Sequence, residues 1–250
     1  MNLTTAAVKN HEELFPNHKS TLQQTDPDLI EIFDNFAFDE VMSRGGLDTR
    51  TRVMMILAST IASQALSEYN VMLGAALNVG VSPVEVKEII YQSVPYVGIA
   101  KVLDFILSTN DLLESRGIHL PLDGQSTTSR ETRYEKGLEV QKKIFGETIE
   151  KMYNDSPNDQ IHIQTFLSAN CFGDYYTRKG LDIKTRELLT FAMLISLGGA
   201  EPQVKGHIQG NVNVGNDKEV LLSVATQLLP YIGYPRTLNA IRCLNEVLPE

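Results

Sequence analysis

The chain has 250 residues and a formal net charge of −9, with 42% hydrophobic and 21% charged side chains. This length allows one large domain or two small ones, and the composition is ordinary for a soluble globular protein. No cluster of Lys and Arg offers the phosphate contacts that nucleic acids require, so we expect no nucleic-acid partner. No apolar run reaches the roughly 18 residues that span a bilayer, and the polar start lacks the apolar segment of a signal peptide. We therefore expect no membrane partner and a cytoplasmic location.

The first 26 residues carry few apolar anchors. We interpret residues 1–26 as an N-terminal arm with at most one short helix, ordered against a partner subunit. From Leu29 onward, apolar residues recur mostly at three- and four-residue steps, which is typical of a helix with one buried face. The run Arg44-Gly45-Gly46 is expected to end this helix.

A long, mostly apolar helix is predicted directly after this break. Asp48 is suited to cap it, because a carboxylate accepts hydrogen bonds from the free backbone N–H groups of the first turn. Apolar residues then fill most positions as far as Leu66, which leaves little of the helix to face water. We expect it to lie at the centre of a bundle. A second helix should follow and stop at Gly80, where glycine suits the left-handed position beyond a helix end.

Two more helices are predicted before a linker. Residues 82–85 combine serine, proline and glutamate in the pattern of a capping box. The helix that they start should reach about Val94, and the next should run to about Ser115. Residues 117–130 are rich in Gly, Pro, Ser and Thr and lack periodicity, which indicates a linker. No segment shows convincing period-two alternation, so the predicted fold class is all-α.

Three short motifs recur in the same order with an offset of 134 or 135 residues. They pair LDTRTR at 47–52 with LDIKTR at 181–186, NVG at 78–80 with NVG at 213–215, and PYVG at 95–98 with PYIG at 230–233. Recurrence at a nearly fixed offset indicates duplication. We therefore predict two tandem pseudo-symmetric repeats, a degenerate one over 27–116 and a second over 131–250.

The two repeats differ at positions that matter for chemistry. Glu187 and His207 of the second repeat correspond to Val53 and Met72 of the first. Because only the second repeat has a carboxylate and an imidazole there, we expect one site per chain. The alternative is that Glu187 is a surface charge and His207 a satisfied, partly buried histidine, in a non-catalytic binding or scaffold protein.

As a group, these motifs resemble the carboxymuconolactone decarboxylase family, which shares the alkylhydroperoxidase-D-like (AhpD-like) fold. The second repeat resembles a whole family chain, with an opening helix near 134–140, an approach at 172–182 and a core from Thr185 to Pro235. The first repeat resembles only the core. The resemblance implies an AhpD-like all-helical bundle that self-associates, and we favour a homotrimer over a dimer or a hexamer.

In the redox branch of that fold, a helix Glu, a CxxC pair and a His form a proton relay. The two Cys positions of that branch would fall near Gly199 and Pro202, and neither residue can replace a thiolate nucleophile. A peroxidase or disulfide reductase activity is therefore disfavoured. Cys171 and Cys243 are far apart in the sequence, and we expect both to be buried, inert thiols.

The decarboxylase branch implies a carboxy-lyase that needs neither a metal nor an organic cofactor and acts on a small carboxylate-bearing lactone or ring. Loss of CO₂ leaves negative charge delocalised toward a carbonyl, which requires an acid to deliver a proton. We expect His207 to be this acid/base, because an imidazole ordinarily titrates near neutrality, with Glu187 orienting it. In an antiparallel hairpin, however, the two groups would be offset by roughly 7–8 Å along the helix axis.

Four further residues are candidates for substrate binding, namely Arg236, Tyr234, Tyr231 and Asn211. Arg236 could clamp a carboxylate, but its counterpart in the first repeat is Lys101, so a structural salt bridge is an equal alternative. Tyr231 has a counterpart in the first repeat, which favours a place in the core. The remaining histidines have no spacing with carboxylates that is typical of metal ligands, so no metal site is predicted.

Overall fold

The computed structural model describes residues 1–249. Within that range the chain forms helices and no strand, which confirms the all-α prediction. The elements are α1 (Thr5–Leu14), α2 (Leu22–Thr25), α3 (Pro27–Asn35), the π-helix η1 (Phe36–Glu40), α4 (Thr49–Ala62), α5 (Leu66–Asn78), α6 (Pro83–Val97), α7 (Ile99–Ser115), α8 (Arg133–Phe145), α9 (Thr148–Asp155), α10 (Ile161–Phe166), the π-helix η2 (Leu167–Tyr176), α11 (Ile183–Leu197), α12 (Glu201–Asn213) and α13 (Lys218–Val247).

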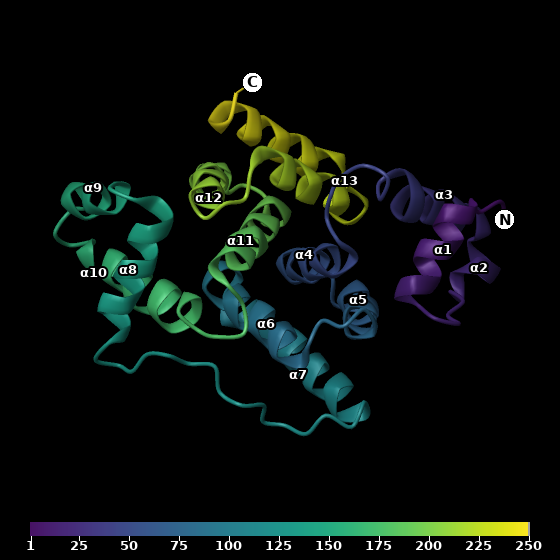
Figure 1. Cartoon of the computed structure of the whole chain (residues 1–250), viewed down its shortest axis with the longest axis horizontal. Helices are drawn as coiled ribbons and strands as arrows, with labels where there is room; N and C mark the ends of the chain where they lie inside the picture. Colours follow the sequence, from purple (N-terminus) through teal and green to yellow (C-terminus); the bar gives the residue numbers. More distant parts are fainter. Residues whose placement is uncertain (250) are drawn as a thin grey trace.

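The two halves of the chain are arranged about a shared centre. Figure 1 shows α1–α3 at one end and α8–α10 at the other, with α4 and α11 between them, α13 above and α6 and α7 below. α4 and α11 lie against each other, and the fully buried Ser196 hydroxyl donates to Ser59 Oγ over 2.7 Å at their contact. Both helices are almost wholly buried, as their apolar sequences predict.

The first 26 residues pack against their own chain, so the expectation of an arm ordered by a partner subunit is wrong. Ala7 and Leu14 of α1 are fully buried. Asn78 Nδ2 donates to the Leu14 carbonyl over 3.0 Å, and Asn213 Nδ2 donates in the same way to the Ile144 carbonyl over 2.7 Å. α1 therefore takes in the first repeat the place that α8 takes in the second.

Most predicted helix ends are confirmed, because they depend on local hydrogen bonds. Asp48 accepts from the Thr51 backbone N–H, and Ser82 and Glu85 form a capping box. One boundary is wrong: α4 ends at Ala62 and Leu66 begins a new helix, because the chain turns at Gln64 with a positive φ of 59°. The second helix of that pair, α5, ends as predicted, and α6 continues to Val97 with Pro95 in its last turn.

Two glycines let α8 and η2 pack backbone against backbone. A Cβ on Gly137 would lie 1.9 Å from the Ser168 carbonyl oxygen, and one on Gly173 would lie 2.0 Å from the Arg133 carbonyl oxygen. No side chain can occupy either position without separating these helices. The contact holds α8 and η2 together as one wall beside α11 and α12, where the candidate site lies.

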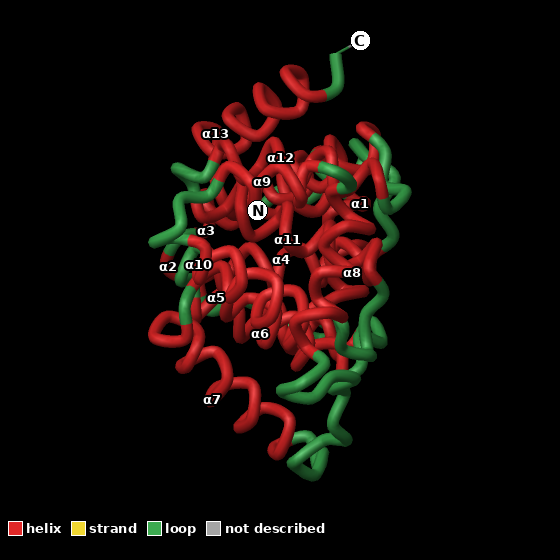
Figure 2. Tube along the Cα trace, turned by 90° about the vertical axis from the view of Figure 1, so that its left-hand side faces the viewer, coloured by secondary structure: helices red, strands yellow, loops and turns green. Residues whose placement is uncertain are grey.

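The linker runs in the structure as an irregular segment between α7 and α8 along one edge of the molecule (Figure 1). Within residues 1–249 no helix is both long enough and apolar enough to cross a bilayer. Loops gather mainly along one side of the molecule, while α7 and the second half of α13 project at its two ends (Figure 2).

Candidate functional site

Two successive helices of the second repeat carry the predicted pair. Asp182 caps α11 by accepting from the Thr185 backbone N–H over 2.7 Å. α11 ends at Leu197, and the chain then turns through Gly198 and Gly199, whose φ angles of 73° and 69° favour glycine. This turn starts α12 directly, so that α12 returns beside α11.

Glu187 and His207 are in contact. His207 Nδ1 lies 2.9 Å from Glu187 Oε2, and the Glu187 side chain is fully buried. The axial offset calculated for an antiparallel hairpin does not apply, because the two helices are not antiparallel neighbours. Figure 1 shows α12 nearly end-on beside α11, so the two helices cross rather than run side by side. Gly210 allows the approach, since a Cβ there would lie 2.8 Å from Glu187 Oε2.

The rest of the Glu187 carboxylate is also hydrogen-bonded. The Tyr176 hydroxyl donates to Glu187 Oε1 over 2.9 Å, so each carboxylate oxygen has a partner. Burial and the neighbouring Glu187 charge raise the pKa of Tyr176 well above its usual value. The phenol is therefore a neutral donor at ordinary pH. With Nδ1 bound to the carboxylate, Nε2 is the His207 nitrogen left for a ligand.

Asn211 lies beneath the pair rather than in a binding position. It is fully buried, and its Nδ2 donates to the backbone carbonyls of Glu187 and His207 over 3.0 and 2.7 Å. Its Oδ1 accepts from Asn216 Nδ2 over 2.8 Å. Since its hydrogen-bonding groups are already used, Asn211 holds α12 onto α11, and its expected role in substrate binding has no support from its position.

His207 lines a cavity of about 590 Å³ between the α8–α9 segment, η2, α11 and α12, which we call the His207 cavity. Its apolar lining includes Phe145, Ile149, Met152, Leu167, Leu194 and Leu197. Its polar lining comprises Tyr96, Gln141, Thr148, Cys171, Gln203 and His207. A cavity of this size with few polar groups is typical of a small-molecule site.

Two aromatic rings pack against the imidazole. The Phe145 ring meets it edge to face at 5.2 Å between centroids, and the Tyr96 ring does so at 5.9 Å. Tyr96 comes from the end of α6, in the first repeat, and its hydroxyl lies 3.0 Å from that of Tyr176. Both repeats therefore contribute side chains to this site, although the sequence predicted it from the second repeat alone.

Cys171 is the one thiol among the described residues of the cavity lining. Its Sγ lies 3.9 Å from the Tyr96 hydroxyl, and burial raises the pKa of the thiol to about 12. Such a thiol stays protonated and is a poor nucleophile. Cys243 is also buried and free. The prediction of two buried thiols without a disulfide is confirmed.

Three predicted substrate-binding residues lie outside the His207 cavity. Arg236 lies in a small hollow beside Gly198 and Cys243, and Tyr234 is 62% exposed on α13. Tyr231 lines a separate hollow of the first repeat, with its ring 6.4 Å from that of Phe33. Their position therefore gives no support to the predicted role in substrate binding at His207, and Tyr231 packs against the core, as its counterpart in the first repeat favoured.

That hollow of the first repeat is the smaller counterpart of the His207 cavity. It measures about 190 Å³, and Pro230 and Tyr231 close it as Pro95 and Tyr96 close the larger one. Where the second repeat has the ion pair, the first has buried Val53 and Met72. Each repeat thus supplies the Pro-Tyr pair that closes the hollow of the other. Of these two hollows, the larger one has the His207–Glu187 pair at its wall.

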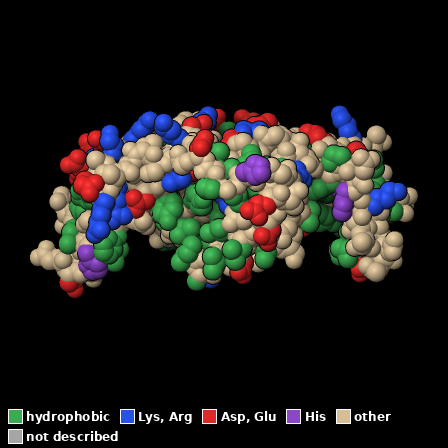
Figure 3. Space-filling view, turned by 90° about the horizontal axis from the view of Figure 1, so that it is seen from below, with side chains coloured by type: hydrophobic (Ala, Val, Ile, Leu, Met, Phe, Trp, Pro, Cys, Tyr) green, Lys and Arg blue, Asp and Glu red, His purple; other side chains and the backbone are tan. Residues whose placement is uncertain are grey.

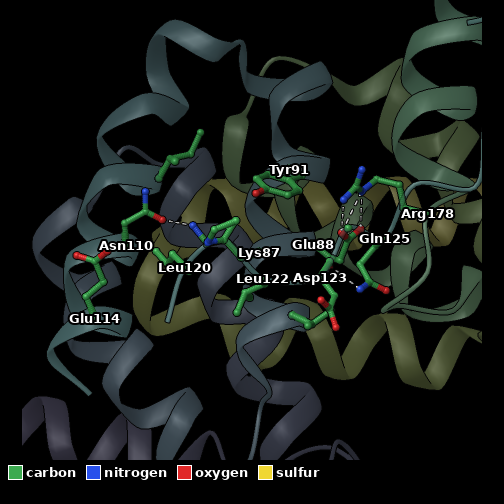
Figure 4. A pocket seen from close by; sticks show the side chains of 14 residues that line it. Lys87, Glu88, Tyr91, Asn110, Glu114, Leu120, Leu122, Asp123, Gln125 and Arg178 are labelled. Carbon is green, nitrogen blue, oxygen red and sulfur yellow. Dashed lines mark hydrogen bonds and ion pairs between the residues drawn. The ribbon is translucent and has the colours of Figure 1, made fainter. Parts of the chain in front are cut away.

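A second sizeable cavity, of about 430 Å³, lies between α6, α7 and the linker (Figure 4). Its central carboxylate, Glu88, pairs with Arg178 at 2.9 Å and with the fully buried Arg186 at 2.8 Å. Lys87 donates to Asn110 on the opposite side of the cavity (Figure 4). Because Glu88 is bound to two guanidinium groups, one from η2's C-terminal side and one from α11, these charges join the two repeats. The lining also contains the carboxylates of Glu114 and Asp123 (Figure 4).

Among residues 1–249, no group of three or more His, Cys, Asp or Glu side chains is placed to hold a metal ion. The His207 cavity is lined by one imidazole, the Tyr96 phenol and the Cys171 thiol within a mostly apolar wall, and a buried carboxylate and the Tyr176 phenol lie behind the imidazole. An all-helical bundle with such an imidazole–carboxylate pair defines a class of acid–base sites.

The comparisons with known proteins identify this class. The family model described as "Carboxymuconolactone decarboxylase family" matches residues 27–110 and 162–246, one segment in each repeat. The chain belongs to this family. It is also 31% identical over 121 residues to 4-carboxymuconolactone decarboxylase of Acinetobacter baylyi, an alignment that covers 48% of this chain and 90% of that protein. The suspected family and the two-repeat architecture are both confirmed.

Proposed function

We propose that this chain is a cofactor-independent carboxy-lyase that acts on a carboxylate-bearing lactone or ring, with His207 as general acid. The observation that carries the proposal is the 2.9 Å contact between His207 Nδ1 and a fully buried carboxylate, at the wall of a cavity. A buried carboxylate fixes the orientation of the imidazole that it contacts. Family membership and the decarboxylase relative support this reaction class.

The proposed reaction needs no reactant other than the substrate and a proton from water. The bond between a ring carbon and its carboxylate breaks, and CO₂ leaves. The electron pair moves through the ring double bond to the lactone carbonyl, forming an enolate. Imidazolium Nε2 of His207 then gives its proton to the carbon beside that carbonyl, and the imidazole regains a proton from water.

Two other functions, a non-catalytic scaffold and a peroxidase, have weaker support. A non-catalytic scaffold would bury the ion pair on all sides, whereas His207 borders a cavity. A peroxidase would need a reactive thiolate, and burial raises the pKa of the Cys171 thiol to about 12. Gly199 and Pro202 occupy the positions at which the redox branch has its cysteines.

The test of the proposed function is turnover of carboxymuconolactone by the wild-type chain, followed by ultraviolet absorbance and by CO₂ release. We expect both signals to rise together, one CO₂ for each ring converted. A folded chain that releases no CO₂ from this compound or from the analogues described below would overturn the carboxy-lyase proposal.

We also propose that the chain self-associates as a homotrimer, through α7 and the second half of α13. Ile99, Leu103 and Leu107 form an exposed apolar stripe on α7, and Tyr234 and Leu238 form the matching stripe on α13. Figure 3 shows apolar side chains gathered across the middle of the face on which α6 and α7 lie. The two helices project at opposite ends of the molecule (Figure 2). A head-to-tail contact between unlike stripes generates a closed ring of three chains when each contact rotates one chain by a third of a turn relative to the next.

Light scattering on a sizing column tests the assembly. We expect a particle of three 27.8-kDa chains for the wild type and smaller particles for Leu103→Arg, because an arginine in the stripe cannot be buried without a partner. Val71→Arg, on an exposed position of α5, is the matched control and should keep the wild-type mass. A monomeric wild type would refute the proposal. The cytoplasmic location expected from the sequence stays a prediction.

A further inference from the structure

The His207 cavity lacks a cationic side chain other than its histidine. Among the described residues that line it, none is Lys or Arg. Arg236, the one arginine predicted to clamp a carboxylate, lies instead in the hollow beside Gly198. A carboxylate transferred from water into an apolar cavity needs a cation or several hydrogen-bond donors to offset its desolvation. Among the described lining residues, His207 is the one side chain that can carry a positive charge. The other polar donors include the amides of Gln141 and Gln203 and the Thr148 hydroxyl, which is already bound to the Phe145 carbonyl.

The rest of the cavity is an apolar sleeve. Met152 of α9, Leu167 of η2 and Leu194 and Leu197 of α11 line it, together with Phe145 beside the imidazole. These side chains come from four different elements, so the sleeve is formed by the folded bundle as a whole rather than by one loop. Side chains of this kind bind methylene groups and aromatic carbon through burial and dispersion.

We infer that the substrate is a monocarboxylate with an apolar body: its single carboxylate sits at His207, and an alkyl or aryl substituent fills the sleeve. This inference rests on the proposed function, whose reaction it leaves unchanged. It separates this chain from enzymes for small dicarboxylates, because a second carboxylate would lie in the sleeve without a cation. Each methylene buried in the sleeve should tighten binding about fourfold.

Binding is tested first, apart from catalysis. The probes are γ-lactones with saturated alkyl side chains of increasing length, from γ-hexalactone through γ-octalactone to γ-decalactone, titrated into the wild-type chain by calorimetry. We expect the dissociation constant to fall about fourfold per methylene until the sleeve is full. An affinity that does not change with chain length would overturn the inference.

A charged substitution locates the binding site. Met152→Lys places an ammonium group in the sleeve from a half-buried position and should abolish the dependence on chain length. Val71→Lys is the control, because its side chain is exposed on α5, away from this cavity. Circular dichroism at 222 nm checks that both variants keep the helical content of the wild type. A Met152→Lys protein that is folded and binds the whole series like the wild type would also refute the inference.

Turnover then separates the two proposals. The substrates are carboxymuconolactone and an analogue in which a hexyl chain replaces its carboxymethyl arm. We expect kcat/KM for the hexyl compound to exceed that for the dicarboxylate at least tenfold. Graded lactone binding without any CO₂ release would uphold the substrate class and reject the carboxy-lyase. Faster turnover of the dicarboxylate would uphold the carboxy-lyase and reject the substrate class.

Discussion

Replacing His207 with alanine is expected to lower kcat for CO₂ release by a factor of about 10² or more, because the enolate would then take its proton from water. KM should also rise, because the alanine variant loses the one side chain of the cavity lining that can pair with the substrate carboxylate. Stopped-flow ultraviolet absorbance at saturating substrate measures kcat directly. The effect follows from the position of His207, the one imidazole in the cavity wall.

Alanine also removes the partner of a fully buried carboxylate, so part of its effect could come from unfolding. His207→Gln avoids this, because its amide can still donate to Glu187 while it cannot deliver a proton at neutral pH. We expect both variants to lose activity and only the alanine variant to lose several degrees of Tm. His162→Ala, on the exposed side of α10, should behave like the wild type. A folded His207→Gln protein with wild-type kcat would rule out His207 as the acid.

Features that depend on near neighbours in the sequence were predictable. Asp48, Asp182 and the Ser82–Glu85 pair cap their helices, because each cap is completed by a residue three positions on. The duplication was also predictable, because its motifs recur in the same order at a nearly fixed offset. The same alignment shows that the first repeat lacks the acid and base. These local signals define the helices and single out Glu187 and His207.

The exchange of tyrosines between the repeats could not be predicted from the sequence. Tyr96 and Tyr231 occupy equivalent positions, and the alignment gives no sign of which hollow either one enters. In the folded chain, α6 ends beside η2 and α12, so that Tyr96 reaches the His207 cavity while Tyr231 closes the hollow of the first repeat. This placement depends on how α4 and α11 pack at the centre, which is a property of the whole bundle.

The apolar sleeve was also beyond sequence reasoning. Met152 lies on α9 and Leu167 at the start of η2, with a loop and α10 between them, and no motif marks either position. Gly137 and Gly173 bring α8 and η2 into backbone contact, and the chain between these two helices carries Met152 to the cavity lining. Sequence spacing could identify the acid and its carboxylate, while the shape that selects the substrate arises only from long-range packing.

Replacing Glu187 with glutamine is expected to lower kcat by a factor of about 10² to 10⁴, with little change in fold. The amide has the size of the carboxylate and keeps partners in Tyr176 and His207, so Tm should stay within a few degrees of the wild type. It carries no negative charge, however, and its NH₂ group can turn toward Nδ1. His207 then holds its proton on Nε2 only as a neutral imidazole, which is a much weaker acid than the imidazolium.

Tyr176→Phe is the matched control for this substitution. It removes one hydrogen bond from Glu187 Oε1 but leaves both the carboxylate charge and its 2.9 Å contact with His207. Its kcat should therefore fall by about tenfold or less, since a single hydrogen bond to a charged group contributes roughly 1.5–3 kcal/mol, only part of which changes between ground and transition state. If Glu187 instead serves only to hold α11 onto α12, then Glu187→Gln would retain wild-type kcat. The order of the two variants in kcat thus distinguishes an electrostatic role of the carboxylate from a structural one.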